Sequence, residues 1–394
     1  MRSSSPITRR DLDRLAVPAI ISGIAEPIIA LSDTAFAGRL GAADLAAVGI
    51  GSSFFLLVLW VLAQTRSAVL AVVARYYGEG RLVDVYDLVP IALWMNVGLG
   101  LLFYGITVPL ADAIFTLYDP APVVLEKAIG YYRVRAMGHP LALGVFAMTG
   151  AFRGIQNMQW SMWISTTGAA VNLALNPVLI FGWGPAPAMG INGSALASVI
   201  AQGIMFLVAA RVLVRRTPFA LLPDRWHHRE LAGLLRNSGN LFARTIALNA
   251  CYFFGNRFAS GYGLAYIGAH SIAMQLWLFS AFFIDGYAAA GSIIAGRLNG
   301  EGDRVQLHRV SWQVVRITVY IGAALAVLYI AGYRTIGGWF TNDAEVLHRF
   351  EQVFGDGRVA AVKGDREAGI AELRRRPAVL GVEDGQPVGV GQQV

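Results

Sequence analysis

Long apolar segments separated by short polar turns dominate this sequence. Crossing a bilayer core takes about 20 mostly apolar residues in a helix, and segments of that length recur along the chain. They cover residues 15–40, 48–74, 88–117, 131–152, 160–183, 189–213, 241–258, 267–295 and 310–336. The pattern therefore predicts an all-α polytopic membrane protein.

Composition supports this prediction. Hydrophobic residues make up 56% of the chain and charged residues only 14%, and the mean hydropathy is +0.53, far more apolar than an ordinary globular domain. A net charge of +7 would suit nucleic-acid binding in a soluble protein, but in a membrane protein the distribution of charge matters more than the sum. The single cysteine, Cys251, excludes an intramolecular disulfide.

The basic residues predict the orientation. With the N-terminus inside, the inner ends and loops carry 16 Lys and Arg residues and the outer ones carry seven, as the positive-inside rule requires. The inner segments are 1–14, 75–87, 153–159, 211–236 and 297–309. We therefore expect a multi-pass protein of the inner (cytoplasmic) membrane with a cytoplasmic N-terminus. The first segment is too long and too polar for a cleaved signal peptide.

An internal repeat relates the two halves at a fixed offset of 222 residues. The sequence GAADLAAVGI at 41–50 aligns with GLAYIGAHSI at 263–272, and RYYGEG at 75–80 aligns with RLNGEG at 297–302. Six segments precede the second copy, so both copies run in the same direction, which favours two lobes around a central cavity and alternating access. The R-x-x-G-E-G sequence itself predicts a helix C-terminus, with a basic residue near the negative end and glycine turning the chain.

The repeat also predicts the domain organisation. We expect a cytoplasmic N-terminus at 1–14, a six-helix N-lobe at 15–213, a cytoplasmic linker at 214–236, a partial three-helix C-lobe at 237–354 and a polar tail at 355–394. The tail holds twelve charges, six of each sign, and no apolar run long enough to span a membrane. It is either a genuine soluble tail, partly helical or disordered, or the product of a frameshift or gene-model error near residue 355.

Two carboxylates in the first segment are candidates for ion coupling. An ionisable side chain inside a membrane costs about 2.5–3.5 kcal/mol on insertion scales, so it faces a cavity or a partner. Glu26 lies seven residues before Asp33, two turns away on the same helix face. On a helix bent by Pro18 and Pro27, the two carboxylates can form a ladder for a cation or a proton. The alternatives are an interfacial position for Asp33 and a structural hydrogen bond for Glu26.

Further polar candidates lie in later segments. Asn172 and Asn176 are one helical turn apart and face one way, so their amides can ligate a cation, bond a carboxylate or join neighbouring helices. In the second half, Asp285, Arg244 and Gln275 are possible C-lobe cavity residues. Structural roles, such as a salt bridge for Arg244 and close helix packing beside Asp285, fit the sequence equally well.

Several of these segments together resemble the MATE (multidrug and toxic compound extrusion) transporters, in particular the DinF-type branch. The motifs are PAIISGIAEPIIALSDTAFAGRLGAADLAAVGIGSSFF, ARYYGEG, NLALNPVLIFGWG followed by MGINGSALASVIAQ, and HSIAMQLWLFSAFFIDG with AGRLNGEGD, from about residue 10 to residue 354. The resemblance implies two six-helix lobes in a V, which export mostly cationic amphiphilic compounds in exchange for inward H⁺ or Na⁺.

The resemblance also implies roles for individual residues. Asp33 matches the essential acidic residue of the first helix, Pro18 its bending proline, Asn172 a polar member of the N-lobe cluster and Ser198 a hydroxyl position on helix six. Asn176 departs from the pattern, because some DinF-type members have a second aspartate there and an amide cannot take up a proton. Glu26 could take the place of this second carboxylate. The seventh segment has Arg244 and no acidic residue, so the sodium site that other branches carry in the second lobe is not expected, and we expect coupling by protons through Asp33.

Three functions remain open at this point. The first is an antiporter for drugs or metabolites. The second is a lipid-linked oligosaccharide flippase of the related superfamily, which a basic cavity faced by Arg66 and Arg244 would favour. The third is a truncated fragment that transports nothing. The sequence has no metal-ligand cluster, P-loop or nucleophile elbow, so an enzyme is not expected. We expect no cofactor, no ATP and no nucleic acid, and a monomer in the lipid bilayer acting on a small-molecule substrate.

Overall fold

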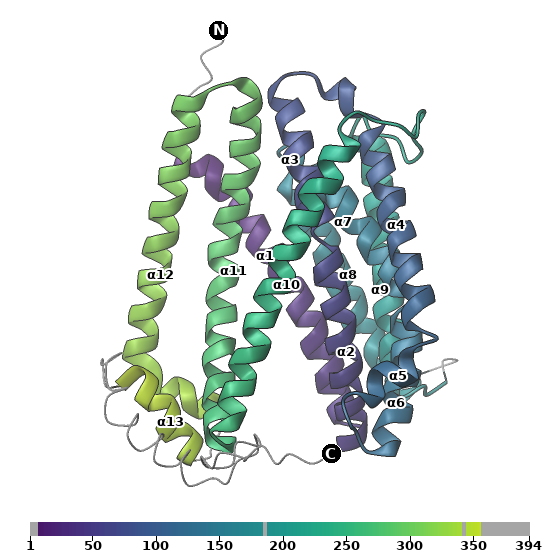
Figure 1. Cartoon of the computed structure of the whole chain (residues 1–394), viewed down its shortest axis with the longest axis vertical. Helices are drawn as coiled ribbons and strands as arrows, with labels where there is room; N and C mark the ends of the chain where they lie inside the picture. The colour runs from purple at the N-terminus through teal and green to yellow at the C-terminus, as the bar shows by residue number, and fades with distance from the viewer. Residues whose placement is uncertain (1–6, 184–186, 341–343, 356–394) are drawn as a thin grey trace, which may run out of the picture. The chain divides into compact units, whose positions relative to one another are not determined.

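A computed structural model of the chain describes residues 7–183, 187–340 and 344–355 (Figure 1). The described residues form helices, which confirms the all-α prediction. The elements are α1 (Arg9–Gly38), α2 (Ala42–Leu62), α3 (Thr65–Gly78), the 3-10 helix η1 (Leu82–Val85), α4 (Leu88–Thr107), α5 (Ala111–Thr116), α6 (Pro122–Arg135), α7 (Gly138–Gly154), α8 (Met158–Phe181), α9 (Ile191–Arg216), α10 (Leu231–Gly261), α11 (Leu264–Glu301), α12 (Arg304–Phe340) and α13 (Ala344–Gly355).

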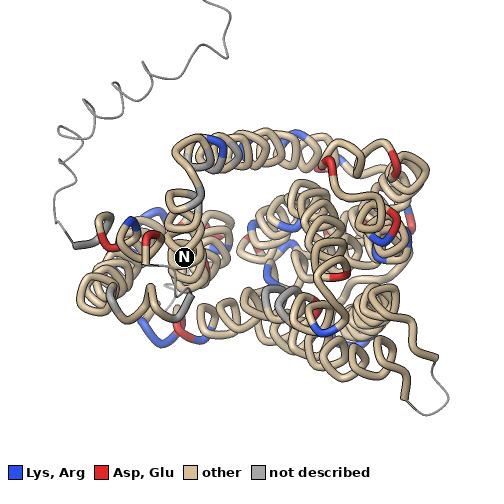
Figure 2. The backbone as a smooth tube through the Cα atoms, turned by 90° about the horizontal axis from the view of Figure 1, so that it is seen from below, with Lys and Arg blue, Asp and Glu red and all other residues tan. Residues whose placement is uncertain are grey.

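Six helical segments within the described residues are long and apolar enough to cross a membrane. They are Ala42–Gly78, Leu82–Thr107, Met158–Phe181, Ile191–Arg216, Gly268–Glu301 and Arg304–Tyr333. The predicted segments 15–40, 131–152 and 241–258 are also helical, in α1, in α6 with α7, and in α10. Charged residues occupy few positions along the backbone (Figure 2), as an apolar surrounding requires.

Three segments predicted as single helices are broken in the structure. The segment 48–74 is divided between α2 and α3, the segment 131–152 between α6 and α7, and the segment 88–117 between α4 and α5. The second break lies just before Pro140, which has no backbone N–H to continue the helical hydrogen bonds of the preceding turn. Hydrophobic periodicity does not change at the first two breaks, so the pattern could not reveal them. The break makes Arg135 the last residue of α6.

Small residues let the helices of the first half approach closely. The helix α7 packs against α3, α4 and α9, while α1 packs against α8 and α8 against α9. A Cβ atom at Gly100 of α4 would lie 2.5 Å from the Cα atom of Pro140, and one at Gly193 of α9 would lie 2.3 Å from the carbonyl oxygen of Leu179. Such close backbone contacts are typical of helix packing in membranes.

The chain divides into two compact units. One comprises Met1–Phe258 with Met274–Ala326, and the other comprises Ala259–Ala273 with Val327–Val394. In the second unit, Val346 and Phe350 of α13 pack against Gly268 and Gly337, respectively. Residues 356–394 lie outside the described residues, so the two interpretations of the polar tail stay predictions, as do the lobe boundaries.

Local geometry in the two repeat copies agrees with the 222-residue offset. Gly41 and its counterpart Gly263 have φ angles of +139° and +114°, and Gly80 and Gly302 have φ angles of +70° and +74°. These backbone conformations favour glycine because it has no Cβ. In both R-x-x-G-E-G sequences the arginine is paired with the glutamate four residues later, at 3.6 Å for Arg75–Glu79 and at 3.3 Å for Arg297–Glu301. The helix-end prediction is confirmed for both copies.

The same two sequences contact each other directly in the first unit. A Cβ atom at Gly78 would lie 2.0 Å from the carbonyl oxygen of Arg297, and a Cβ atom at Gly300 would lie 2.0 Å from the carbonyl oxygen of Arg75. Because Gly78 and Gly300 are repeat counterparts, as are the two arginines, the contact is reciprocal. Only glycine at both positions permits this approach of the α3 and α11 backbones.

The predicted linker is held to the end of α3 by polar contacts. The hydroxyl of Tyr76 donates to Glu230 Oε1 at 2.9 Å, and Arg75 Nη2 lies 3.0 Å from the same oxygen. Partial burial acts to raise the pKa of Glu230, but the bonds from Tyr76 and Arg75 outweigh burial and hold that pKa below its ordinary value.

Substitution of Gly78 by alanine should destabilise the folded protein. The new Cβ atom forces the two backbones apart, and overpacking of this kind costs about 1–3 kcal/mol. We expect a lower midpoint of thermal unfolding for Gly78→Ala and Gly300→Ala in detergent, measured by tryptophan fluorescence. Gly98→Ala is the control, because a Cβ atom there meets open space. Equal midpoints for Gly78→Ala and Gly98→Ala would contradict the reciprocal contact.

The contact of the linker should weaken in acid. Because the pKa of Glu230 is lowered in the folded protein, the contact contributes stability above the ordinary carboxyl pKa of about 4.3 and loses it as the pH falls through the lowered value. At neutral pH, Glu230→Gln should reproduce the acidic state and speed amide hydrogen exchange in residues 225–236. Glu126→Gln, at an exposed position, should leave that exchange unchanged; unchanged exchange in Glu230→Gln as well would disprove the role of the carboxylate.

Candidate functional site

The polar site is built from three helices that pack on one another. Asp33 comes from α1, Asn172 and Asn176 from α8, and Ser194 and Ser198 from α9. The two asparagines are four residues apart, as are the two serines, so each pair presents its side chains on one helix face. Because α1 packs on α8 and α8 packs on α9, these two faces converge on Asp33.

Asp33 is buried and its carboxylate is surrounded by hydrogen-bond donors. Only 3% of the residue is exposed. Its Oδ1 atom accepts from Asn176 Nδ2 at 2.8 Å, from Ser194 Oγ at 3.1 Å and from Asn172 Nδ2 at 3.3 Å. Its Oδ2 atom accepts from Ser198 Oγ at 3.0 Å. Four donors satisfy an ionised carboxylate, which accepts hydrogen bonds and donates none.

The two carboxylate oxygens of Asp33 have different surroundings. Three donors from two helices occupy Oδ1, whereas Oδ2 accepts from the hydroxyl of Ser198, which also accepts from Asn172 Nδ2 at 2.9 Å. A hydroxyl rotates and exchanges the roles of donor and acceptor, which an N–H group cannot do. A rotation of the Ser198 hydroxyl is therefore enough to change the surroundings of Oδ2.

The amide of Asn176 extends the network and leaves one atom free. Its Nδ2 atom also lies 3.1 Å from Asn172 Oδ1 and 3.2 Å from Ser32 Oγ. Its Oδ1 atom is buried and has no hydrogen-bond partner among the described residues. Buried polar atoms normally have a partner, so this oxygen is available to a ligand or to a rearranged network.

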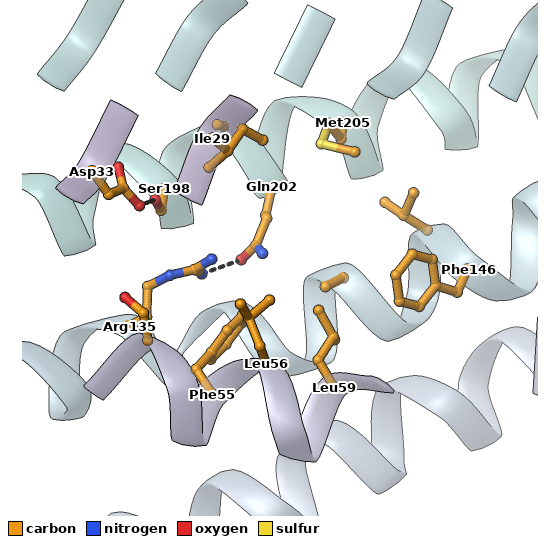
Figure 3. Close-up of a pocket in the computed structure, with 14 residues that line it drawn as sticks. Ile29, Asp33, Phe55, Leu56, Leu59, Arg135, Phe146, Ser198, Gln202 and Met205 are labelled. Atoms are coloured by element: carbon orange, nitrogen blue, oxygen red, sulfur yellow. Dashed lines mark hydrogen bonds between the residues drawn. The ribbon is translucent and has the colours of Figure 1, made fainter. Parts of the chain in front are cut away.

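A cavity of about 60 Å³ opens beside the site. Asp33 and Ser198 line it together with Arg135 and Gln202, and the other lining residues are mainly apolar: Ile29, Ser52, Phe55, Leu56, Leu59, Ala142, Val145, Phe146, Ala201 and Met205. In Figure 3 the bonded pairs Asp33–Ser198 and Arg135–Gln202 lie at one end of the cavity, and Phe146 and Met205 lie at the other. The cavity thus has a polar end that carries both signs of charge and an apolar end.

Most of the predicted coupling residues meet in this site. Asp33, Asn172, Asn176 and Ser198 are hydrogen-bonded to one another, so Asp33 is buried between helices within the described structure. Glu26 belongs to α1, but its side chain lies outside the described part of the chain, and the carboxylate ladder stays a prediction.

The predicted bending prolines and C-lobe residues lie outside the hydrogen-bonded site around Asp33. The helix α1 continues through Pro18 and Pro27, and the side chain of Pro27 is not described. The side chain of Arg244 in α10 is exposed, as are those of Gln275 and Asp285 in α11. None of these three lines the cavity beside Asp33, and their role in a C-lobe cavity stays a prediction.

Sequence reasoning missed three contributors to the site. Ser194 and Gln202 lie four residues on either side of Ser198, so the helical period could have placed all three on one face. Arg135 lies within the predicted segment 131–152, and the rule that an ionisable residue in a membrane faces a cavity or a partner would have identified it. Its position near the start of that segment made it resemble a helix-end residue.

Comparisons with known proteins agree with this fold. The family model described as MatE matches residues 18–178 and 241–354. Protein DETOXIFICATION 43 of Arabidopsis thaliana is 26% identical over 404 residues, which cover 88% of this chain and 76% of the relative. The probable multidrug resistance protein NorM of Deinococcus radiodurans is 30% identical over 347 residues, covering 84% of this chain and 73% of the relative.

A solved structure described as a crystal structure of MATE in the bent conformation has the same fold. The TM-score is 0.79 at 21% identity, with 88% of this chain and 76% of that chain covered. The two blocks matched by the family model lie on either side of the predicted linker and together cover more than half of the sequence. The chain therefore belongs to the MatE family of multi-pass membrane transporters.

Proposed function

We propose that the protein is a secondary antiporter that exports cationic amphiphilic drugs or metabolites in exchange for protons, with Asp33 as the residue that carries the exchange. The observation that supports this most directly is a buried carboxylate held by donors from α8 and α9 at the edge of a largely apolar cavity. A cation and a proton compete for one negative charge, which is the requirement for antiport.

The two ligands of Asp33 weaken each other by thermodynamic necessity. If protonation of Asp33 reduces the affinity for the cation by some factor, the bound cation reduces the affinity for the proton by the same factor. At Oδ2, the proton needs only a rotation of the Ser198 hydroxyl, and this oxygen belongs to a residue that lines the cavity. A proton that enters from outside therefore releases the exported cation into the outer medium.

This exchange requires a two-state protein around the site. We propose that an N-lobe at 15–213 and a C-lobe that begins at 237 rock against each other, as parallel repeats favour, in an inner membrane with the N-terminus in the cytoplasm. The DinF-type branch and a monomeric state in the bilayer belong to the same proposal. The names of the curated relatives, which include a probable multidrug resistance protein, support it.

Sodium is the alternative coupling ion, and one observation favours it. Asn176 Oδ1 is buried without a partner among the described residues, and amide and carboxylate oxygens are suitable ligands for a hard cation. A half-turn of the Asn172 amide would turn its oxygen, in place of Nδ2, toward Asp33 and Ser198. The proton remains the proposed ion because hydrogen-bond donors already occupy the positions around the Asp33 oxygens that a metal ion would need.

The flippase alternative receives less support from the cavity. It needs a strongly basic cavity faced by Arg66 and Arg244. The guanidinium of Arg66 lies 4.8 Å from the ring centroid of Phe146 and Arg244 is exposed, and neither lines the cavity beside Asp33.

Replacement of Asp33 by asparagine should strongly reduce export. The amide keeps the shape of the side chain but has no charge to exchange, and coupling of this kind is worth about 1–3 kcal/mol, so efflux of ethidium from cells should fall by about 5–150-fold. Asp112→Asn is the matched control, because the Asp112 side chain is 71% exposed. Membrane insertion should be equal in both variants. Equal efflux rates for Asp33→Asn and Asp112→Asn would disprove the proposed function.

The coupling ion can be identified in proteoliposomes. A proton gradient imposed without sodium should drive dye transport, and a sodium gradient imposed at equal pH on the two sides should not. The reason is that donors already occupy both oxygens of Asp33, so a metal ion would have to displace several of them, whereas a proton needs only a rotation of the Ser198 hydroxyl. Transport driven by sodium alone would instead assign the coupling to a cation held by the oxygens of Asp33 and the two asparagines.

A further inference from the structure

Arg135 is a buried cation at the end of α6 that the proposed proton exchange does not use. Only 6% of the residue is exposed, although it lines the same cavity as Asp33. Its Nη1 atom donates to Gln202 Oε1 at 3.0 Å, and its guanidinium carbon lies 3.7 Å from the ring centroid of Phe55. Figure 3 shows the guanidinium directed along the cavity toward Gln202.

The charge of Arg135 has no direct ion-pair partner among the side chains that the structure describes. No carboxylate oxygen of the described residues lies within 4.0 Å of the Arg135 guanidinium nitrogens. The carboxylate of Asp33 accepts its hydrogen bonds from asparagine and serine side chains instead. A buried charge is costly unless it is paired. Stacking on Phe55, the bond to Gln202 and an interaction with the Tyr131 hydroxyl use only part of a guanidinium group that has five N–H donors.

The free donors of Arg135 define the chemistry of a ligand. A guanidinium group presents its N–H groups as a planar fork that matches the two oxygens of a carboxylate. Gln202 and Phe55 fix the plane of the group, which lowers the entropy lost when a ligand binds. A lysine at this position would present a point charge without this fork.

Size and charge balance narrow the choice further. Cavities that enclose a whole drug-sized molecule measure about 300–1,000 Å³, so a cavity of about 60 Å³ holds an end group of such a molecule. The polar end carries one fixed negative charge, from Asp33, and one fixed positive charge, from Arg135. A simple cation would neutralise the first and leave the second unpaired, whereas a molecule with an amine and a carboxylate satisfies both.

We propose that Arg135, positioned by Gln202 and Phe55, is a carboxylate-binding subsite of this cavity, and that it selects a carboxylate on the same molecule whose cationic end lies at Asp33. The proposal rests on the proposed function in one respect, the placement of the cationic end at Asp33. The apolar body lies against the side chains at the other end of the cavity, such as Phe146 and Met205.

The test compares two dyes that differ in one group. Rhodamine B carries a cationic xanthene system and a free carboxylate, and its ethyl ester carries the cation alone. Binding of each dye to the purified full chain in nanodiscs is measured by fluorescence polarisation. In Arg135→Gln the affinity for rhodamine B should fall by about tenfold or more, as expected when one partner of a buried charge pair is removed, while the affinity for the ester changes little.

Matched variants separate recognition from structure. Arg133→Gln lies two residues earlier on α6, its side chain is 53% exposed, and both affinities should remain at the wild-type level. Arg135→Lys keeps the charge without the fork and should give an intermediate loss for rhodamine B alone; it also replaces Arg135→Gln if that variant does not fold. Equal losses for both dyes, no loss for rhodamine B, or no binding of rhodamine B to the wild type would each overturn the proposal.

Failure of the proposed function gives a different result. Asp33→Asn should weaken the binding of both dyes, because both carry the cation. Asp33→Asn could leave both affinities unchanged while Arg135→Gln selectively lowers the affinity for rhodamine B. That result would support the carboxylate subsite and contradict cation exchange at Asp33.

Discussion

A buried carboxylate is tolerated in an apolar helix bundle only where donors from other helices reach it, and the arrangement around Asp33 depends on this constraint. Its four hydrogen bonds come from α8 and α9, so the register of three helices is fixed by one charged side chain. The donors are uncharged amides and hydroxyls, which stabilise the negative charge without cancelling it.

The reciprocal contact of Gly78 and Gly300 shows how the duplicated sequence acts on structure. The two R-x-x-G-E-G sequences end their helices in the same way, and their glycines bring the backbones of α3 and α11 together at equivalent points. The contact joins backbone to backbone, so it fixes the separation of α3 and α11 at this point.

Much of the fold follows from the sequence, and less of the site does. Apolar segments predict where helices lie, because the bilayer imposes their length, and the repeat predicts the glycines with positive φ. The breaks at 63–64 and 136–137 leave no trace in hydropathy, because both sides of each break are apolar. Asn172 and Asn176 could be placed on one face from their spacing. Spacing likewise places Ser194 on one face with Ser198. The approach of that face and of Arg135 to the site of Asp33 could not be predicted, because it depends on how α9 and α6 are rotated about their axes, which no local pattern encodes.

The central claim is that a proton and a substrate compete for the carboxylate of Asp33. The most direct measurement is the affinity of purified protein for a cationic dye across a pH series, with simultaneous detection of released protons by a pH indicator in weak buffer. We predict that affinity rises with pH, that binding releases up to about one proton per dye molecule over the same pH range, and that Asp33→Asn loses both effects. Dye affinity that is independent of pH in the wild type, or proton release that persists in Asp33→Asn, would contradict the account.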